Sequence, residues 1–232
     1  DYAFGHALER DATEVIKAAG GQVVGSVRHP LNTPDFASYL VRVPATGANV
    51  IGLANAGGDT VNAIKQGGEF GLKESGVSMA ALLTFITDVH AIGLKQAQGL
   101  LLTTSFYWNR TPETRAWAMR FFKQHDAMPT MVQAGVYSSV SHYLKAVKAA
   151  GTTEARVVAA KMRELPVHDI FTDNGKIRED NVMLHDMYLA KVKSPADSKE
   201  PWDYYEILRK IPAEELYWPL SKSKCPLVAK SN

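Results

Sequence analysis

The segment from Val50 to Ile64, VIGLANAGGDTVNAI, is where residue types and spacing indicate chemistry most directly. An apolar strand runs into a glycine-rich turn, and an aspartate follows where a helix should begin. Because Gly57 and Gly58 carry no side chains, the amides at the start of that helix can face a ligand above the strand end. The G-x-G-x-x-G spacing of dinucleotide-binding folds is absent. The turn therefore predicts a loop that binds a small polar or anionic ligand.

Side chains that could catalyse a reaction or bind a metal do not cluster along the chain. The seven histidines are scattered, and none has zinc-ligand spacing to another histidine or to a carboxylate. No G-x-S-x-G elbow marks a nucleophilic serine. Asp59 and Asp88 could serve as acids, but both stand where a helix cap would stand. We predict no catalytic residue, no metal site and no cofactor, and keep a small-molecule enzyme on a doubly wound sheet as an alternative.

Composition narrows the class of protein. The 232 residues are 46% hydrophobic and 22% charged, with a net charge of +2, which is enough apolar content for one large domain or two small ones. No block of lysine and arginine indicates nucleic-acid binding. No apolar run approaches the roughly 18 residues that cross a bilayer. The single cysteine, Cys225, excludes an internal disulfide and any multi-cysteine metal site.

The elements that must position the ligand loops alternate between helix and strand. This rhythm predicts a parallel sheet with right-handed crossovers, whose ligands sit outside the carboxyl ends of the strands. Helices are expected over residues 4–19, from a cap at Thr33 to Val43, over 59–70 with Asp59 as the cap, and over 88–96. Strands are expected over residues 22–27, 50–54, 79–85 and 100–104. The loops expected on the binding side are 1–5, 29–33, 55–59 and 85–88, with 103–109 leaving the sheet.

The pattern changes after Asn109, so we place a lobe boundary near residues 104–110. Helices are expected over 112–125, 134–150 and 153–165, and strands over 167–171 (closed against Ile177 by an Asp173-Asn174-Gly175 turn), 184–192 and 205–208. The first helix has no strand before it, although residues 1–5 look like the loop that such a strand would feed. We therefore expect a missing N-terminal piece.

Several stretches together resemble one known family. They are DYAFGHALERDATEVIKAAGG at the start, TPDF at 33–36, VIGLANAGGDT, QGLLLTTSFYW at 98–108 and AGVYSSVSHYLKAV at 134–147. This series, which covers nearly the whole chain, resembles the periplasmic substrate-binding proteins of branched-chain amino acid type ABC importers. It is more specific for the family than for the ligand.

The resemblance implies a two-lobed α/β fold of the type 1 periplasmic binding kind, with parallel sheets flanked by helices. Residues 1–103 would form the C-terminal ligand-binding lobe without its first strand, 104–110 a hinge crossover, and 111–232 the remainder of the N-terminal lobe and the closing segments. The first part of the N-terminal lobe would lie outside the chain. Relatives with a CPLV-like tail imply a disulfide from Cys225 to a cysteine in that missing part, and a free buried thiol is the alternative.

The resemblance also implies a set of ligand-binding residues. Phe4 or Tyr2 would stack on the ligand, although Phe4 could instead be a hydrophobic staple under its helix. Asp88 is either the acid that holds an amino acid's ammonium group or a helix cap, and we favour the cap. The full set is Tyr2, Phe4, Asn55, Ala56, Gly57, Thr84, Phe85, Asp88 and Tyr107.

A pocket that is rich in aromatic rings and lacks a secure acid suits an aromatic carboxylate of the benzoate or cinnamate type better than a zwitterion. The expected function is the periplasmic solute-binding component of an ABC importer, which delivers this ligand to a membrane permease without chemical turnover. Binding of a branched-chain or other amino acid is the alternative within the family, and a ligand-sensing receptor domain would share the same binding chemistry. The expected partners are the small-molecule ligand, the permease and the missing N-terminal fragment, with no nucleic acid.

Overall fold

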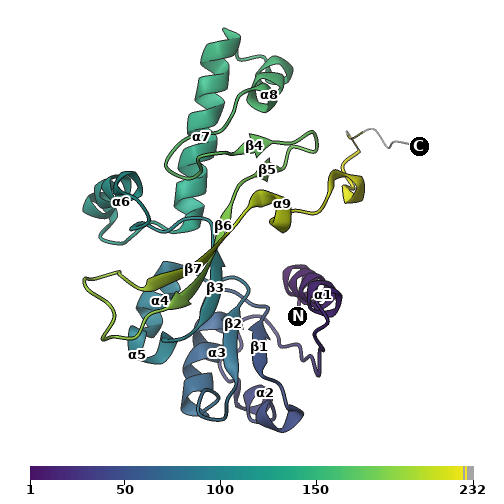
Figure 1. Ribbon diagram of the computed structural model, residues 1–232, viewed down its shortest axis with the longest axis vertical. Helices are drawn as coiled ribbons and strands as arrows, with labels where there is room; N and C mark the ends of the chain where they lie inside the picture. The colour runs from purple at the N-terminus through teal and green to yellow at the C-terminus, as the bar shows by residue number, and fades with distance from the viewer. Residues whose placement is uncertain (227, 229–232) are drawn as a thin grey trace. The chain divides into compact units, whose positions relative to one another are not determined.

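The computed structural model describes residues 1–226 and 228, which form two compact units (Figure 1). The first unit contains Asp1–Thr103 and Leu189–Leu208. The second contains Thr104–Tyr188 and the described residues from Arg209 onward. The chain therefore passes from one unit to the other at three places, and the segment 189–208, which the sequence assigns to the closing segments, lies with the first unit.

The first unit is built on a five-stranded sheet in the order β1-β2-β3-β6-β7. Its strands are β1 (Val50–Leu53), β2 (Ser78–Ala81), β3 (Leu101–Thr104), β6 (Met187–Val192) and β7 (Tyr205–Ile211). Strands β1, β2 and β3 are parallel, with Ile51 opposite Met79 and Ala80 opposite Leu101. This sheet with its flanking helices confirms the predicted α/β fold class.

The helices of the first unit are α1 (Ala3–Ala18), α2 (Ala37–Leu40), α3 (Gly58–Glu69), α4 (Ile86–Ile92) and α5 (Leu94–Ala97), with a 3-10 turn, η1, at Pro44–Thr46. Helix α3 packs against α2, α4 and α5. Its inner face buries Ala63, Ile64 and Gly67, which recur at the spacing of one helix face. A Cβ atom at Gly67 would lie 2.9 Å from the sulfur of Met79, so a larger residue here would require the Met79 side chain to shift.

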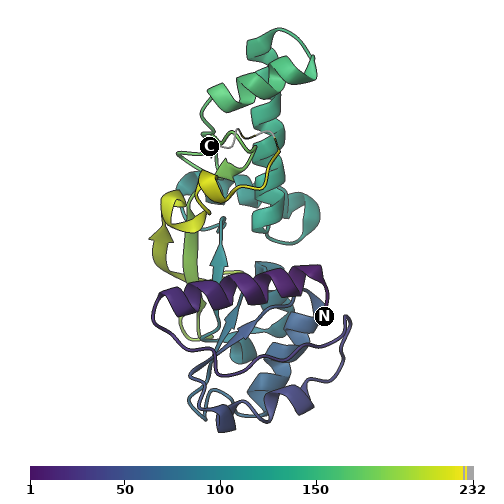
Figure 2. The ribbon, with the colours of Figure 1, turned by 90° about the vertical axis from the view of Figure 1, so that its right-hand side faces the viewer.

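The strand expected over residues 22–27 is wrong, because the segment forms no strand. A strand needs a neighbour to satisfy its backbone donors and acceptors, and no described residue pairs with this segment. The side chains of Val24 and Val27 are 52% and 68% exposed. Figure 2 shows α1 lengthwise, with the connecting segment running back beside it.

Two helix predictions in the first unit also differ from the structure. Helix α1 has the expected bounds within one residue, but none of its residues is buried, and Val15 of the expected apolar face is 58% exposed. Helix α2 starts later than the Thr33 cap predicts, because the Thr33 hydroxyl donates to the Pro30 carbonyl, 2.6 Å away. Phe36 and Leu40 are buried as expected.

The second unit is mainly helical and follows the expected pattern closely. It contains α6 (Pro112–His125), α7 (Met131–Ala150), α8 (Ala155–Glu164), β4 (Lys176–Ile177), β5 (Met183–Leu184), α9 (Ala213–Leu216) and the 3-10 turn η2 (Leu220–Lys222). Thr111 caps α6, with Pro112 at the first helical position, where the missing N–H costs no hydrogen bond. Helix α7 packs along α8.

The strand expected over residues 167–171 is wrong, because only Val167 makes a bridge there. Val167 bridges to Gly175, and Ile177 pairs with Met183 in the antiparallel β4–β5 pair instead of closing against the 167–171 segment. A Cβ at position 175 would lie within 3.0 Å of Thr172, Met183 and Val167, so the close bridge requires glycine. The thiol of Cys225 is free and the residue half-buried, and its implied pairing outside the chain stays a prediction. Across the described part of the chain, no helix is both long and apolar enough to span a membrane.

Candidate ligand-binding site

The glycine-rich turn follows β1 and ends where α3 begins. Gly57 has φ +59° and ψ −133°, a conformation that strains any residue with a side chain, and it occupies the N-cap position without a side-chain bond. Asp59 is therefore not the N-cap that the sequence predicts, since it lies in the first helical turn. Its carboxylate accepts a hydrogen bond from the backbone N–H of Asn32, 3.2 Å away. Asp59 thus connects this turn to the 29–33 loop.

Asn55 is a nearly buried polar side chain of the turn, with 7% of its surface exposed. Its Oδ1 atom accepts from the hydroxyl of Thr60 at 2.8 Å. Its Nδ2 atom lies 3.1 Å from Nε2 of His29, and Nδ1 of His29 lies 2.8 Å from the Pro30 carbonyl oxygen. The sequence predicts the 29–33 loop on this side, but His29 is not among the predicted site residues. The sequence feature that could have identified His29 is a histidine directly before a proline, in a loop that is expected beside Asn55.

The first loop lies against the end of β1. A Cβ at Gly5 would be 3.2 Å from the carbonyl oxygen of Ala54, which shows how closely the start of α1 approaches the turn. The rings of Tyr2 and Phe4 are 5.8 Å apart and tilted by 32°. Tyr2 is exposed and Phe4 half-buried, so both rings retain surface that a flat ligand can contact.

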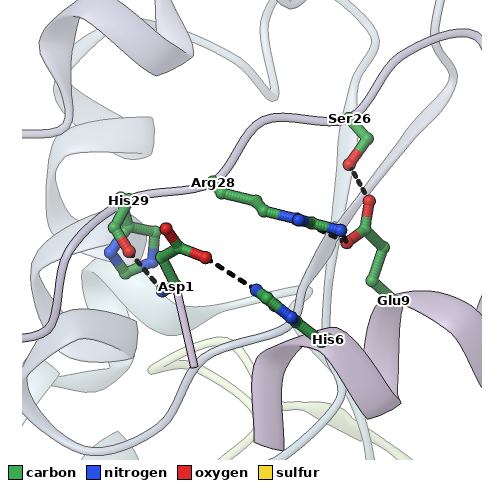
Figure 3. Close-up of polar contacts among 6 residues, drawn as sticks. All are labelled: Asp1, His6, Glu9, Ser26, Arg28 and His29. Atoms are coloured by element: carbon green, nitrogen blue, oxygen red, sulfur yellow. Dashed lines mark hydrogen bonds and ion pairs between the residues drawn. The ribbon is translucent and has the colours of Figure 1, made fainter. Parts of the chain in front are cut away.

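Polar contacts hold α1 to the extended segment that precedes His29 (Figure 3). Glu9 accepts hydrogen bonds from the Ser26 hydroxyl and from Nε of Arg28, the latter at 3.0 Å. These two bonds, with the Ser26 bond the larger cause, lower the pKa of the Glu9 carboxyl group. The amino nitrogen of Asp1 donates to the His29 carbonyl, and the Asp1 carboxylate is 2.6 Å from Nε2 of His6. The loops at 1–5, 29–33 and 55–59 are thereby linked.

The third predicted loop follows β2, which pairs with β1. Just beyond β2, the N–H of Leu82 donates to the carbonyl of Leu53, 3.1 Å away, and so extends the pairing of the two strands. The Asp88 carboxylate accepts from the backbone N–H of Phe85 at 2.8 Å and from the buried Thr84 hydroxyl at 3.4 Å. Asp88 therefore caps α4 from its third position by bonding back to the N-cap residue. Burial raises the pKa of Asp88, and these two hydrogen bonds oppose the rise.

Tyr107 belongs to the second unit, whereas the other eight predicted site residues belong to the first. Its ring is buried and lies 6.1 Å from that of Trp108. Its contact with a ligand stays a prediction, as do the contacts of the other eight.

The loops of the first unit present mainly hydrogen-bond donors and aromatic surface. Of the acidic side chains in them, Asp59 and Asp88 accept bonds from backbone N–H groups, and the Asp1 carboxylate lies against His6. Among the described residues, no group of three or more histidine, cysteine, aspartate or glutamate side chains is placed to hold a metal ion. The arrangement can bind a small ligand through amide donors and ring contacts.

Comparisons with known proteins agree on one family. The family model described as "Periplasmic binding protein" matches residues 1–199. A solved periplasmic binding protein from Burkholderia mallei is 51% identical, with a TM-score of 0.91 over 98% of this chain and 60% of that chain. A branched chain amino acid ABC transporter periplasmic ligand-binding protein from Burkholderia xenovorans is 39% identical, with a TM-score of 0.89 over 98% of this chain and 61% of that one.

A curated relative, the Leu/Ile/Val-binding protein homolog 6 of Brucella melitensis, is 30% identical over 157 residues. That match covers 65% of this chain and 40% of the relative. The chain thus spans well under two thirds of the length of the relatives it matches.

Proposed function

The chain belongs to the periplasmic binding protein family, and on that premise we propose that it is part of the solute-binding component of an ABC importer. Its ligand is a small aromatic carboxylate of the benzoate or cinnamate type. The protein acts in the periplasm, binds this ligand without converting it and delivers it to a membrane permease. The name of the relative from Burkholderia xenovorans supports the transport role, and that of the relative from Brucella melitensis supports binding of a small solute.

The observation that carries the choice of ligand is the state of the acidic side chains in these loops, of which Asp1 lies 2.6 Å from Nε2 of His6. An amino acid's ammonium group needs a carboxylate or other acceptors, yet Asp59 and Asp88 both accept bonds from backbone N–H groups at 3.2 and 2.8 Å. The turn after β1 instead offers the amides that precede and begin α3, which favour negative charge. The rings of Tyr2, Phe4 and Phe85 supply surface for a flat ligand. Asn55, Ala56, Gly57 and Thr84 complete the proposed binding set in this unit.

The fold is compatible with such ligands. Two solute-binding proteins of ABC transporters from Rhodopseudomonas palustris, solved in complex with benzoate and with 3,4-dihydroxy benzoic acid, are 17% and 21% identical to this chain. At that identity the likeness shows the fold alone, so the proposal for the ligand rests on the residues.

We further propose that a segment of a longer protein completes the first unit. Strand β1 is at the edge of the sheet order, and Val24 and Val27 beside α1 are exposed. Exposed apolar side chains next to an unpaired strand edge are the features that a further strand or helix covers in a complete α/β lobe. The relatives have the length to supply one, since the match covers 60% of the Burkholderia mallei chain.

Calorimetric titration of the complete protein tests the proposed ligand class. Titration with 4-hydroxybenzoate, p-coumarate and leucine should show binding of an aromatic acid and little binding of leucine. Tighter binding of leucine would favour the second candidate, a branched-chain amino acid binding protein, which the names of the relatives support. Formation of a product from a bound ligand on prolonged incubation would contradict the transport role.

A further inference from the structure

Hydrogen bonds link Pro30, His29, Asn55 and Thr60 in series. One backbone carbonyl determines which group donates and which accepts along this series. The Pro30 carbonyl oxygen can only accept, so Nδ1 of His29, 2.8 Å away, carries the proton. In the neutral ring Nε2 is then an acceptor. The group that faces it at 3.1 Å must donate, which identifies that group as the Nδ2 end of the Asn55 amide.

Thr60 cannot decide the orientation of Asn55 by itself. A hydroxyl group both donates and accepts, so it would satisfy either end of the amide at the observed 2.8 Å. His29 makes the difference, and its ring is held by Phe36, edge-on at 4.8 Å, and by Tyr39 at 6.2 Å. The imidazole is therefore placed to select one of two nearly isosteric arrangements of the amide.

The selected arrangement leaves one hydrogen-bonding group of Asn55 unused. Nδ2 carries two hydrogens, and His29 takes only one of them. Thr60 is fully buried and His29 half-buried, so the Oδ1 end of the amide points into the unit and the Nδ2 end toward its surface. The outward end of this nearly buried side chain therefore presents an N–H donor.

We infer that His29 is a positioning residue, which orients Asn55 so that its spare N–H donates to the carboxylate of the bound ligand. This inference rests on the proposed function and deepens it. A carboxylate accepts such a donor, whereas an ammonium group has no acceptor to offer and would face a like-signed N–H dipole. The pair His29–Asn55 thus selects for a carboxylate on this side of the site.

Two variants at His29 separate positioning from packing. His29→Leu keeps apolar contact with Phe36 and Tyr39 but removes the acceptor, so the affinity for 4-hydroxybenzoate should fall about tenfold, the value of one hydrogen bond to a charged group. His29→Gln retains an acceptor and should stay within about threefold of the unchanged protein. His168→Leu is the matched control, because Nδ1 of His168 likewise lies 2.9 Å from a backbone carbonyl oxygen, that of Asp173, outside the proposed binding set, and its affinity should not change.

Nitrogen-15 NMR of the complete protein gives a readout that a purely structural role would not produce. His29 should show a protonated Nδ1 and an unprotonated Nε2, and one Asn55 Nδ2 proton should be coupled to that Nε2. In His29→Gln the acceptor is an oxygen, so this coupling is absent, but the same Asn55 proton should keep its hydrogen-bonded chemical shift, which it should lose in His29→Leu. A protonated Nε2, or undiminished binding by a folded His29→Leu, would overturn the inference. If His29→Leu does not fold, Asn55→Asp replaces the spare donor by an oxygen and should weaken 4-hydroxybenzoate binding at least tenfold, and unchanged binding would again overturn it.

Failure of the proposed function is distinguishable from failure of the inference. If the unchanged protein binds none of the aromatic carboxylates, the ligand class is wrong whatever the His29 tautomer. If it binds them while His29 has the other tautomer, the proposed function stands and the positioning role is wrong.

Discussion

Helices α3 and α1 of the first unit have similar apolar periodicity, yet the structure holds them in opposite ways. Helix α3 buries Ile64 completely and brings Gly67 against Met79. Helix α1 buries no residue and is held by Glu9 through Ser26 and Arg28. The difference teaches that periodicity defines the apolar face of a helix, whereas only the neighbouring elements decide whether that face is covered.

This contrast divides the roles of the two helices. Apolar burial supplies most of the stability of a fold, whereas exposed ion pairs such as Glu9–Arg28 contribute little. The α3 side therefore stabilises the unit, while the α1 side carries Tyr2 and Phe4 and lies against the 26–29 segment, which contains His29. The predictions below would break or sharpen this division.

The largest difference is expected between truncations on the two helices. Ile64→Ala should lower the free energy of unfolding by about 2–5 kcal/mol, because it leaves a cavity in a closely packed core. Val15→Ala should change it by less than about 0.5 kcal/mol, since that side chain is largely exposed. Urea unfolding of the 232-residue chain measures both. Equal losses in the free energy of unfolding for the two variants would contradict this division of roles. A loss for Val15→Ala that appears only in the complete protein would support a further segment that covers α1.

The next effect concerns ligand affinity rather than stability. Tyr2→Ala should weaken binding of an aromatic acid by roughly 1 kcal/mol, the value of one aromatic contact, without a matching loss of stability. Calorimetric titration measures the change. Tyr143→Ala, which truncates a comparably exposed tyrosine of α7, is the control and should bind normally. An unchanged affinity for Tyr2→Ala would place Tyr2 outside the site.

The smallest effect is on the pH dependence of stability. Burial raises the pKa of Asp88 in the folded protein, so its contribution to stability is complete below the unfolded-state pKa and declines as the pH rises through the folded value. Asp88→Asn keeps an oxygen for the Phe85 N–H and removes the ionisation. Carboxyl groups with a raised pKa titrate between roughly pH 4 and pH 7. Over this range the melting temperature of Asp88→Asn should therefore change less with pH than that of the unchanged protein. An unchanged profile would show that Asp88 is solvated in the folded state.

Much of the fold is predictable because its signals are local. The Thr111-Pro112 start of α6 and the glycine-rich exit from β1 each require only neighbouring residues to form. The positions of β1, β2 and β3 follow from short apolar runs between turn residues. The 22–27 segment has the same apolar character but forms no strand, because pairing requires a partner that no described residue supplies.

The candidate site shows the same limit at the level of side chains. The sequence places Asn55, Gly57 and Asp88 in loops at the carboxyl ends of strands, and a helix-capping role for Asp88 is visible from its position alone. The connection of Asp59 to Asn32 and of Asn55 to His29 spans 27 and 26 residues, respectively. No local pattern encodes such contacts.

The sequence by itself identified the family through its resemblance and predicted most of the alternation of helix and strand, because apolar runs, glycine, proline and capping residues act on their neighbours along the chain. Only the tertiary structure decided which amphipathic faces are covered and which way the Asn55 amide points. Burial and hydrogen-bond direction depend on groups brought together from distant parts of the chain, and here the carbonyl of Pro30 acts through His29 on the side chain of Asn55.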